Sequence, residues 1–394
     1  MPKNRYRAAG LFVLILVLFG GVGCHARRQA RAADRNVSTG TWTYKIDDKI
    51  KTITLTGSPY QRGYTHGKAL KPQIHKVVEL WKRNIRSNFS MDADRFVSQF
   101  MKSTDFLPAI RQWTPELLDE VKGISDGAEI DFNTIFLYQT VDEVWLNGHD
   151  VVNPNEQTNS NEAQEHCSAV GIQKHGSSPA VAGQTMDIEP FYQGYQTVLH
   201  IKYDTSDLEA LVLTAAGMIG LTGMNSHAIG VNANTLAQLE RAPRGVPANF
   251  IVRKLLSQET KTAAVALLHQ IPHASGQNYM ISDPGGISDF ECSAKRVLEY
   301  TDPKTPLAIF HTNHPLLSNE EHPRNPGSVF DSWSTQRFVK VAKSIYGKDP
   351  ATLNKTTLDA IFSRYPVCNR GTFGRMVMTL SARPELEIKA GCPR

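Results

Sequence analysis

The sequence predicts a layered α+β fold, because helical patterns come first and short strand patterns follow. Residues 51–145 carry one alternating strand and then several amphipathic helices, whereas the chain from residue 168 onwards carries many short β patterns. Further helical patterns interrupt those strands. At 394 residues, 41% of them hydrophobic and 21% charged, the chain is long enough to bury a large core.

The helical part follows a strand at residues 51–57, which the turn Gly57-Ser58-Pro59 ends. The spacing of apolar residues predicts a long helix over 62–89, a second over 93–101 and a further one over 133–145. Between them, Thr114 followed by Pro115 predicts an N-cap with proline at the first helical position.

A polar segment, residues 147–165, separates these helices from the strands. Strands are expected at residues 168–173, 180–187, 197–203, 210–215, 228–233 and 279–282, with two closing strands at 375–380 and 386–389. The inserted helices are expected at residues 247–257, 261–269, 333–346 and 351–364.

Positive charge is concentrated in the first 40 residues, which hold seven Lys and Arg side chains against Asp34 alone. The whole chain has a formal charge of +5, so the remainder is close to neutral, at −1. Nothing in that remainder argues for nucleic-acid binding.

Residues 1–23 predict a signal peptide. Three basic residues precede an apolar run of about 14 residues, which is too short to span a bilayer comfortably. The run ends at Gly21-Val22-Gly23-Cys24, which is similar to a lipobox whose Cys is lipidated, although Gly21 stands where Leu is usual. An ordinary cleavage site near Cys24 or Ala33, or an uncleaved anchor, are the alternatives. Residues 24–40 are interpreted as a flexible tether. The protein is therefore expected to be exported to the periplasm or cell surface, and to be membrane-tethered if Cys24 carries a lipid.

The five cysteines are Cys24, Cys167, Cys292, Cys368 and Cys392. They form no CxxC pair and no Cys/His spacing typical of zinc, so no metal is expected. In an oxidising compartment Cys368 and Cys392 could form a disulfide, which the sequence alone does not establish.

Cys167 has an unusual position, because it stands where the polar segment meets the first of the strands. A lone Cys is usually a small hydrophobic residue in a core, but such a residue would be expected within a strand rather than at its beginning. A Cys–His pair of the papain type is another reading, although none of the 13 histidines stands out as its partner.

Seven short blocks resemble, in order and spacing, the penicillin acyltransferase-type family of cysteine N-terminal nucleophile hydrolases. The similarity runs from about residue 53 to the end of the chain. The blocks are Gly57-x5-Gly63-x2-His66-Gly67; 114–128, with Pro115-Glu116 and Gly123-Ile124; Cys167-Ser168 with Gly183-Gln184-Thr185-Met186-Asp187; Gly223-Met224-Asn225 to Gly230-Val231-Asn232-Ala233-Asn234; Gln277-Asn278-Tyr279 with Glu291; His311-Thr312-Asn313-His314; and Gly391-Cys392-Pro393.

The resemblance implies a four-layer αββα sandwich as a single domain over residues 41–394. It also implies that the chain cuts itself between His166 and Cys167, which leaves a small 41–166 pro-segment chain and a nucleophile-bearing 167–394 chain that stay associated. The new α-amino group has an ordinary pKa near 8, close to about 8.5 for a thiol, so one residue supplies both nucleophile and base. Cys167 is expected to begin a central strand at the mouth of a cleft.

Two further catalytic residues are implied by the resemblance. Asp187 matches the Asp that orients the new amino group, and Asn313 matches the Asn that donates a hydrogen bond to the oxyanion. Either could instead be an ordinary turn residue. Thr185 and Met186 depart from the family's usual Asn and aromatic residue, which concerns substrate contacts more than Asp187 itself.

The function expected is therefore that of a self-processing, exported cysteine amidase or acyltransferase. It would cleave linear amide or thioester bonds of small molecules through an acyl-Cys167 intermediate, without a cofactor. The alternative is a non-catalytic surface lipoprotein that kept the fold. A metal-dependent hydrolase has no ligand set to support it.

Overall fold

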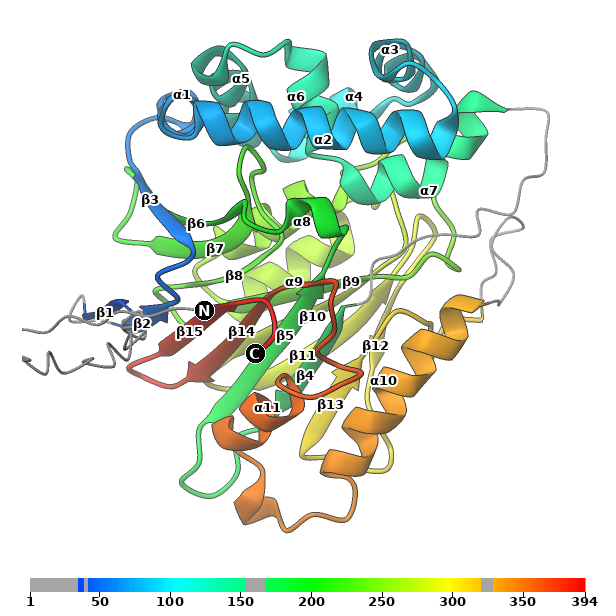
Figure 1. Cartoon of the computed structure of the whole chain (residues 1–394). Coiled ribbons are helices and arrows are strands. Elements are labelled where there is room, and N and C mark those ends of the chain that lie inside the picture. The colour runs from blue at the N-terminus through cyan, green and yellow to red at the C-terminus, as the bar shows by residue number, and fades with distance from the viewer. Residues whose placement is uncertain (1–34, 39–41, 154–166, 320–328, 394) are drawn as a thin grey trace, which may run out of the picture. The chain divides into compact units, whose positions relative to one another are not determined.

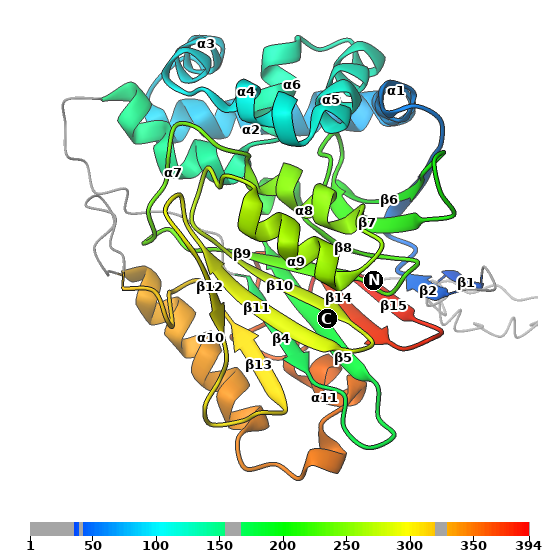
Figure 2. The same cartoon turned by 180° about the vertical axis from the view of Figure 1, so that it is seen from behind.

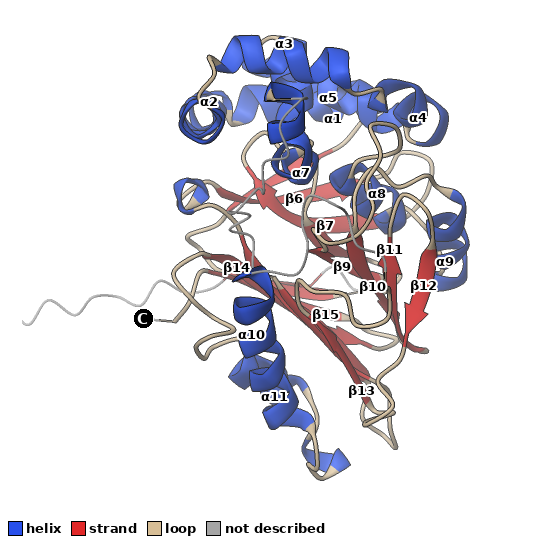
Figure 3. Ribbon diagram, turned by 90° about the vertical axis from the view of Figure 1, so that its right-hand side faces the viewer, coloured by secondary structure: helices blue, strands red, loops and turns tan. Residues whose placement is uncertain are grey.

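Two β-sheets packed face to face form the centre of the protein (Figure 1). The computed structural model describes residues 35–38, 42–153, 167–319 and 329–393, with the side chains of 35–38 and 329–331 left out. Helices cover the outer face of each sheet (Figure 3). This arrangement confirms the predicted α+β fold with four layers in the order αββα.

The first sheet, called sheet A, carries the strand that follows Cys167. Within the described residues it has seven strands in the order β1-β2-β15-β14-β5-β4-β13. Their bounds are β1 Arg35–Ser38, β2 Thr43–Ile46, β15 Glu385–Ala390, β14 Thr372–Leu380, β5 Ala180–Asp187, β4 Ser168–Ile172 and β13 Ala308–His311.

The second sheet, called sheet B, has eight strands among the described residues, in the order β12-β11-β10-β9-β8-β7-β6-β3. Their bounds are β12 Val297–Tyr300, β11 Gly286–Cys292, β10 Gln277–Asp283, β9 Gly230–Thr235, β8 Thr222–Asn225, β7 Glu209–Ala215, β6 Gln196–Lys202 and β3 Lys51–Leu55. The sequence patterns did not predict β1, β2, β8, β11 or β12.

Glycines let the inner faces of the two sheets approach closely. A Cβ added to Gly171 in β4 would lie 2.7 Å from the side chain of Ile287 in β11. One added to Gly230 in β9 would lie 2.5 Å from the sulfur of Met378 in β14. At both places a side chain from one sheet occupies the space left by a glycine in the other.

Two pairs of helices form the outer layers. Helices α10 (Val329–Ile345) and α11 (Lys355–Ile361) cover sheet A and enclose a second apolar cluster with it. Helices α8 (Ala248–Leu256) and α9 (Lys261–Gln270) lie across sheet B (Figure 2).

The helices before residue 153 extend the helical covering of sheet B past α8, next to β3, β6 and β7 (Figure 1). Their bounds are α1 Pro59–Ala69, α2 Lys71–Phe89, α3 Ala93–Ser103, α4 Phe106–Trp113, α5 Pro115–Ala128, α6 Phe132–Tyr138 and α7 Val141–Val152.

Some predicted helices have different bounds in the structure. The expected helix over 62–89 is two helices, because Pro72 has no N–H to continue the hydrogen bonding and stands in the first turn of α2. The expected helix over 133–145 is likewise divided into α6 and α7. Thr114 precedes α5 as predicted, but its hydroxyl donates to the carbonyl oxygen of Ile110 and caps nothing.

The segment before Cys167 contributes to both sheets. Strand β2 pairs in parallel with β15 in sheet A, and β3 pairs in parallel with β6 in sheet B. The helices α1–α7 share one continuous apolar core with the strands. Residues 42–153 are thus part of the same compact unit as residues 167–393.

The expected signal peptide, Cys24 and most of the tether lie outside the described residues. Arg35–Ser38, at the end of the expected tether, instead pairs with the edge strand β2. In the part of the chain that is described, no helix is both long and apolar enough to cross a membrane.

Candidate active site

The ends of three adjacent strands of sheet A create the site. Strand β4 follows Cys167 directly and lies between β5 and β13, antiparallel to both. His311 pairs with Ala169, so the same register continued by two residues sets Asn313 opposite Cys167. Ser168 pairs with Thr185, so Asp187 at the end of β5 lies beside the start of β4. The fold therefore brings the three predicted residues together.

The thiol of Cys167 is buried in the uncut chain. The side chain is 4% exposed, and its sulfur lies 3.4 Å from Met186 Sδ and 3.9 Å from the carbonyl oxygen of Asp187. The expectation that Cys167 sits at the mouth of a cleft is therefore wrong for this structure, in which Met186 of β5 packs against the sulfur. His166, the other side of the predicted cut, lies outside the described residues.

Asp187 is a buried carboxylate with one oxygen still available. Its Oδ2 accepts a hydrogen bond of 2.6 Å from Asn369 Nδ2. Its Oδ1 is buried and has no hydrogen-bond partner among the described residues. Burial raises the pKa of Asp187 to about 7, while Arg337 and hydrogen bonds from Thr372 and Asn369 act in the opposite direction. A buried acceptor without a partner is costly unless a donor arrives.

Asn313 is held in a fixed orientation just after β13. Its backbone N–H donates to Ser334 Oγ over 2.7 Å, and its side-chain Nδ2 donates to the carbonyl oxygen of Thr235 over 3.0 Å. The amide group has two N–H bonds, so one hydrogen remains for another acceptor.

The turn that follows Asn313 is fixed by Glu291, whose carboxylate accepts the backbone N–H of Leu317 over 3.1 Å. The flanking His311 also binds this carboxylate, over 3.1 Å.

Arg337 on α10 contacts two of the predicted residues, Cys167 and Asn313. The sequence patterns did not indicate Arg337 as a site residue. Its Nη1 donates to the carbonyl oxygen of Cys167 and, over 2.9 Å, to Ser168 Oγ. Its Nη2 donates to Asn313 Oδ1 over 2.9 Å. Burial lowers the pKa of Arg337 to about 10, and the negative charge of Asp187 opposes this shift. At neutral pH it is therefore a buried cation at the centre of the site.

Helix α7 ties the segment before Cys167 to the site. Asp142 accepts a hydrogen bond of 2.9 Å from the hydroxyl of Thr235, the residue whose carbonyl oxygen holds Asn313. Trp145 donates its indole N–H to Glu189, two residues beyond Asp187. Burial raises the pKa of Glu189 to about 7, and Asp142 adds to this effect. The helix is thus anchored on two sides of the site.

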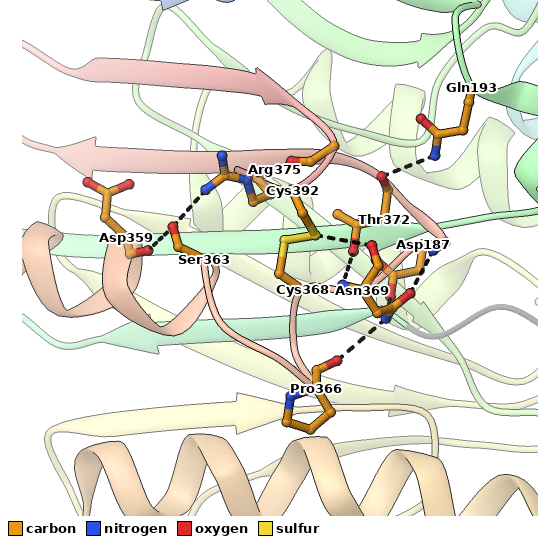
Figure 4. Close-up of a disulfide and its surroundings, with 12 residues drawn as sticks. Asp187, Gln193, Asp359, Ser363, Pro366, Cys368, Asn369, Thr372, Arg375 and Cys392 are labelled. Carbon is orange, nitrogen blue, oxygen red and sulfur yellow. Dashed lines mark hydrogen bonds between the residues drawn. A yellow bond between two sulfur atoms is a disulfide. The ribbon is translucent and has the colours of Figure 1, made fainter. Parts of the chain in front are cut away.

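A cavity of about 1320 Å³ opens beside these residues. Arg337, Asn369 and Thr372 line the wall nearest the site, and the exposed rings of Trp333 and Tyr365 also line it. The predicted pair Cys368 and Cys392 forms a disulfide in the same wall (Figure 4). Basic side chains outnumber acidic ones in the lining. Besides Arg337, the basic residues are Lys49, Arg370, Arg375 and Lys389, and the acidic residue is Asp47.

Comparison with known proteins identifies the family. The sequence profile of the acyl-coenzyme A:6-aminopenicillanic acid acyl-transferase family matches residues 174–379, just over half of the chain. The chain belongs to this family. The resemblance found in the sequence is therefore confirmed.

Relatives of this acyl-transferase family member have several activities. An acyl-coenzyme A:6-aminopenicillanic-acid-acyltransferase 40 kDa form from Emericella nidulans is 25% identical over 288 residues, which cover 72% of this chain and 74% of the relative. A beta-alanyl-dopamine/carcinine hydrolase from Drosophila melanogaster is 25% identical over 233 residues, 56% of this chain and 57% of that protein.

Solved structures similar to this family member include a hydrolase and an acylase. A mutant of the conjugated bile acid hydrolase from Clostridium perfringens matches with a TM-score of 0.38 at 14% identity, over 57% of this chain and 97% of that one. Penicillin V acylase from Agrobacterium tumefaciens matches with a TM-score of 0.31 at 13% identity, over 54% and 79%.

If the chain cuts itself before Cys167, as the resemblance implies, Arg337→Lys is expected to slow both this maturation and turnover by about 100-fold without unfolding the protein. The lysine keeps the positive charge but has one ammonium group, which cannot bind both the Cys167 carbonyl and Asn313 as the guanidinium fork does. Maturation is followed on denaturing gels, and folding by thermal melting. Wild-type rates in a folded Arg337→Lys variant would show that the fork has no role in the chemistry.

Proposed function

We propose that this family member is an exported, self-processing amidase or acyltransferase whose nucleophile is Cys167. The observation that carries the proposal is the convergence of Cys167, Asp187 and Asn313 around the buried guanidinium of Arg337. The substrates are small molecules with a linear amide or thioester bond, and no cofactor takes part.

Maturation begins when Cys167 Sγ attacks the carbonyl carbon of His166. The C–N bond of the peptide breaks, the acyl group moves to sulfur, and the Cys167 nitrogen leaves as a free amine. Water then hydrolyses this thioester, which restores the thiol and leaves a carboxylate on His166. The attachment of α7 through Asp142 and Trp145, and the pairing of β2 and β3 with later strands, support fragments that stay together.

In turnover the α-amine of Cys167 accepts the thiol proton, and the thiolate attacks the substrate carbonyl. The second N–H of Asn313 donates to the oxyanion. Asp187 Oδ1, which has no hydrogen-bond partner in the part of the chain that the structure describes, accepts a hydrogen bond from the amino group and holds it in place. The leaving amine or thiol takes the proton, and water or an acceptor amine then resolves the acyl-Cys167 thioester.

The cavity beside Arg337 and Asn369 is where substrate binds in this proposal. Export rests on the predicted signal peptide, and a lipid on Cys24 would keep the protein at the membrane surface. The disulfide supports an oxidising compartment, since such bonds are rare in the cytosol.

The test is mass spectrometry of the purified chain after incubation with a panel of N-acyl amides and acyl thioesters. We expect two fragments, the larger beginning at Cys167, and an acyl adduct on the N-terminal peptide of that fragment when the reaction is quenched. An intact chain with full activity would contradict the proposal. The alternative, a non-catalytic surface lipoprotein, predicts an uncut chain without any adduct.

A further inference from the structure

Asn369 contacts Asp187 directly and stands in the loop between α11 and β14 (Figure 4). Its Nδ2 donates to Asp187 Oδ2 over 2.6 Å. Its Oδ1 accepts the backbone N–H of Gly371 over 2.7 Å. Because the oxygen of the amide is bound on one side, the nitrogen has to face Asp187. The loop thus presents a donor to the carboxylate in one orientation.

The same loop is closed by the disulfide. Cys368, the residue before Asn369, is bonded to Cys392, which follows strand β15. The sulfur of Cys392 lies 3.1 Å from the carbonyl oxygen of Asn369. At the other end of the loop, the backbone N–H of Asn369 donates to Thr372 Oγ1 over 3.0 Å. The disulfide therefore fixes the residue next to Asn369 to the end of sheet A.

We propose that Asn369 is a positioning residue for Asp187, and that the Cys368–Cys392 disulfide holds Asn369 in its working position. The proposal rests on the function given above, in which Asp187 holds the amino group of Cys167. With Oδ2 bound by Asn369, the carboxylate cannot rotate freely, and Oδ1 stays directed away from the loop. Loss of the donor frees the rotation and removes one hydrogen bond to the charged form.

The charge of Asp187 depends on few neighbours, so the loss of one donor is measurable. Arg337 faces it from α10, the Thr372 hydroxyl from β14 and the Asn369 amide from the loop, while Glu189 follows it in the chain. Two of these four, Thr372 and Asn369, are neutral donors that stabilise the ionised form. Removing either one raises the pKa of Asp187 above its value of about 7.

The decisive measurement is the pH dependence of kcat/KM for wild type and Asn369→Ala. We expect the acidic limb of the profile to move to higher pH by about one unit, so activity at pH 6.5 falls about tenfold and recovers near pH 9. Asn369→Asp should move the acidic limb further, because the aspartate keeps the shape of the side chain, loses the donor and adds a negative charge.

Asn354→Ala is the matched control. Asn354 caps α11 by accepting the N–H of Thr356 over 2.9 Å, is exposed and is not among the residues that line the cavity, so its replacement should leave the profile unchanged.

The disulfide is tested by reduction with a dithiol. Dithiothreitol is oxidised to its cyclic disulfide as Cys368 and Cys392 gain two thiol hydrogens, and Cys167 remains a thiol throughout. In wild type, reduction should move the acidic limb in the same direction as Asn369→Ala, and the double variant Cys368→Ser/Cys392→Ser should behave likewise. In Asn369→Ala, reduction should cause no further displacement.

Two outcomes separate failure of this proposal from failure of the proposed function. If Asp187→Asn retains wild-type activity, the role of Asp187 itself is wrong. If Asp187→Asn is inactive but Asn369→Ala keeps the wild-type pH profile, only the positioning role is refuted. A uniform loss of activity at every pH, with a lowered melting temperature, would also refute it by showing a structural role alone.

Discussion

Cys167→Ala is expected to accumulate as the uncut chain and to lose turnover by a factor on the order of 10⁴ or more. Alanine has no nucleophile for the acyl shift, so the His166–Cys167 bond stays intact and no α-amine forms. Cys167→Ser should still mature, but slowly, because a hydroxyl makes the same acyl shift less readily than a thiol. The measurement is mass spectrometry of the three chains after the same incubation.

Cys292→Ala is the matched control for this experiment. Cys292 is fully buried in β11, and among the described residues no hydrogen bond joins its thiol to Cys167, Asp187, Asn313 or Arg337. Its replacement removes one sulfur atom from the core and should cost about 1 kcal/mol of stability while leaving maturation and turnover intact. If wild type and Cys167→Ala were both cut at the same place, an outside protease would be acting on the chain, and self-processing would be ruled out.

The positions of several strands could be predicted from the sequence. The short β pattern at 180–187 predicted β5 with the bounds that the structure has, and the polar segment marked the point after which most of the strands follow. Strand β11 was missed, because Gly286–Cys292 carries Ser288, Asp289 and Glu291 in a strand buried in sheet B. Several of its polar groups are bound by residues of other strands, for example Asp289 Oδ1, which accepts a hydrogen bond of 2.6 Å from Asn278 in β10. No local pattern records such pairing.

Cys167, Asp187 and Asn313 could be selected from sequence because each matched a block of the family. Arg337 could not be selected that way, since it stands in an ordinary amphipathic helix outside all seven blocks. The residue pattern of this helix nevertheless distinguishes Arg337. Arg337 occupies the same helical stripe as Ser334, Val341 and Ile345, and all four are buried. A charged residue in the apolar stripe of a helix is unusual and marks a site where charge is needed inside.

Asn369 was also missed, for a different reason. Nothing near it in the sequence distinguishes it from an ordinary turn residue, apart from the neighbouring Cys368. Its role depends on Asp187, which is 182 residues away in the chain. Only the pairing of β14 with β5, which brings Thr372 opposite Asp187, puts the loop beside the carboxylate. Contacts of this kind arise from sheet topology and are invisible to local patterns.

Asp187→Asn is expected to inactivate the enzyme and, at the same time, to stabilise the folded chain at pH 8. The amide cannot carry the charge that holds the Cys167 amino group, so turnover should fall about 100-fold or more. The stability gain follows from burial. In the folded chain the pKa of Asp187 is raised from 3.8 to about 7, so the folded state keeps its proton where the unfolded chain has lost it.

The sign of the pH effect follows from proton binding. Between about pH 4 and pH 7 the folded chain binds more protons at this position than the unfolded chain, so the free energy of unfolding falls as pH rises through that window. Asparagine has no such dependence. The advantage of the variant should therefore be small at pH 4, grow up to pH 7 and stay constant above it, reaching about 2–4 kcal/mol. Loss of the counter-charge to Arg337 acts against this gain.

Both proteins are compared in the Cys167→Ala background, so that neither can cut itself during the experiment. Urea unfolding at pH 4.5, 6 and 8 gives the free energy of unfolding for each. The other buried groups with displaced pKa values, such as Glu143 at about 7 and His66 at about 4, are common to both chains and cancel in the difference. A stability difference that does not change with pH would show that Asp187 is ionised as readily in the folded chain as in the unfolded one. Burial would then have no effect on the pKa of Asp187.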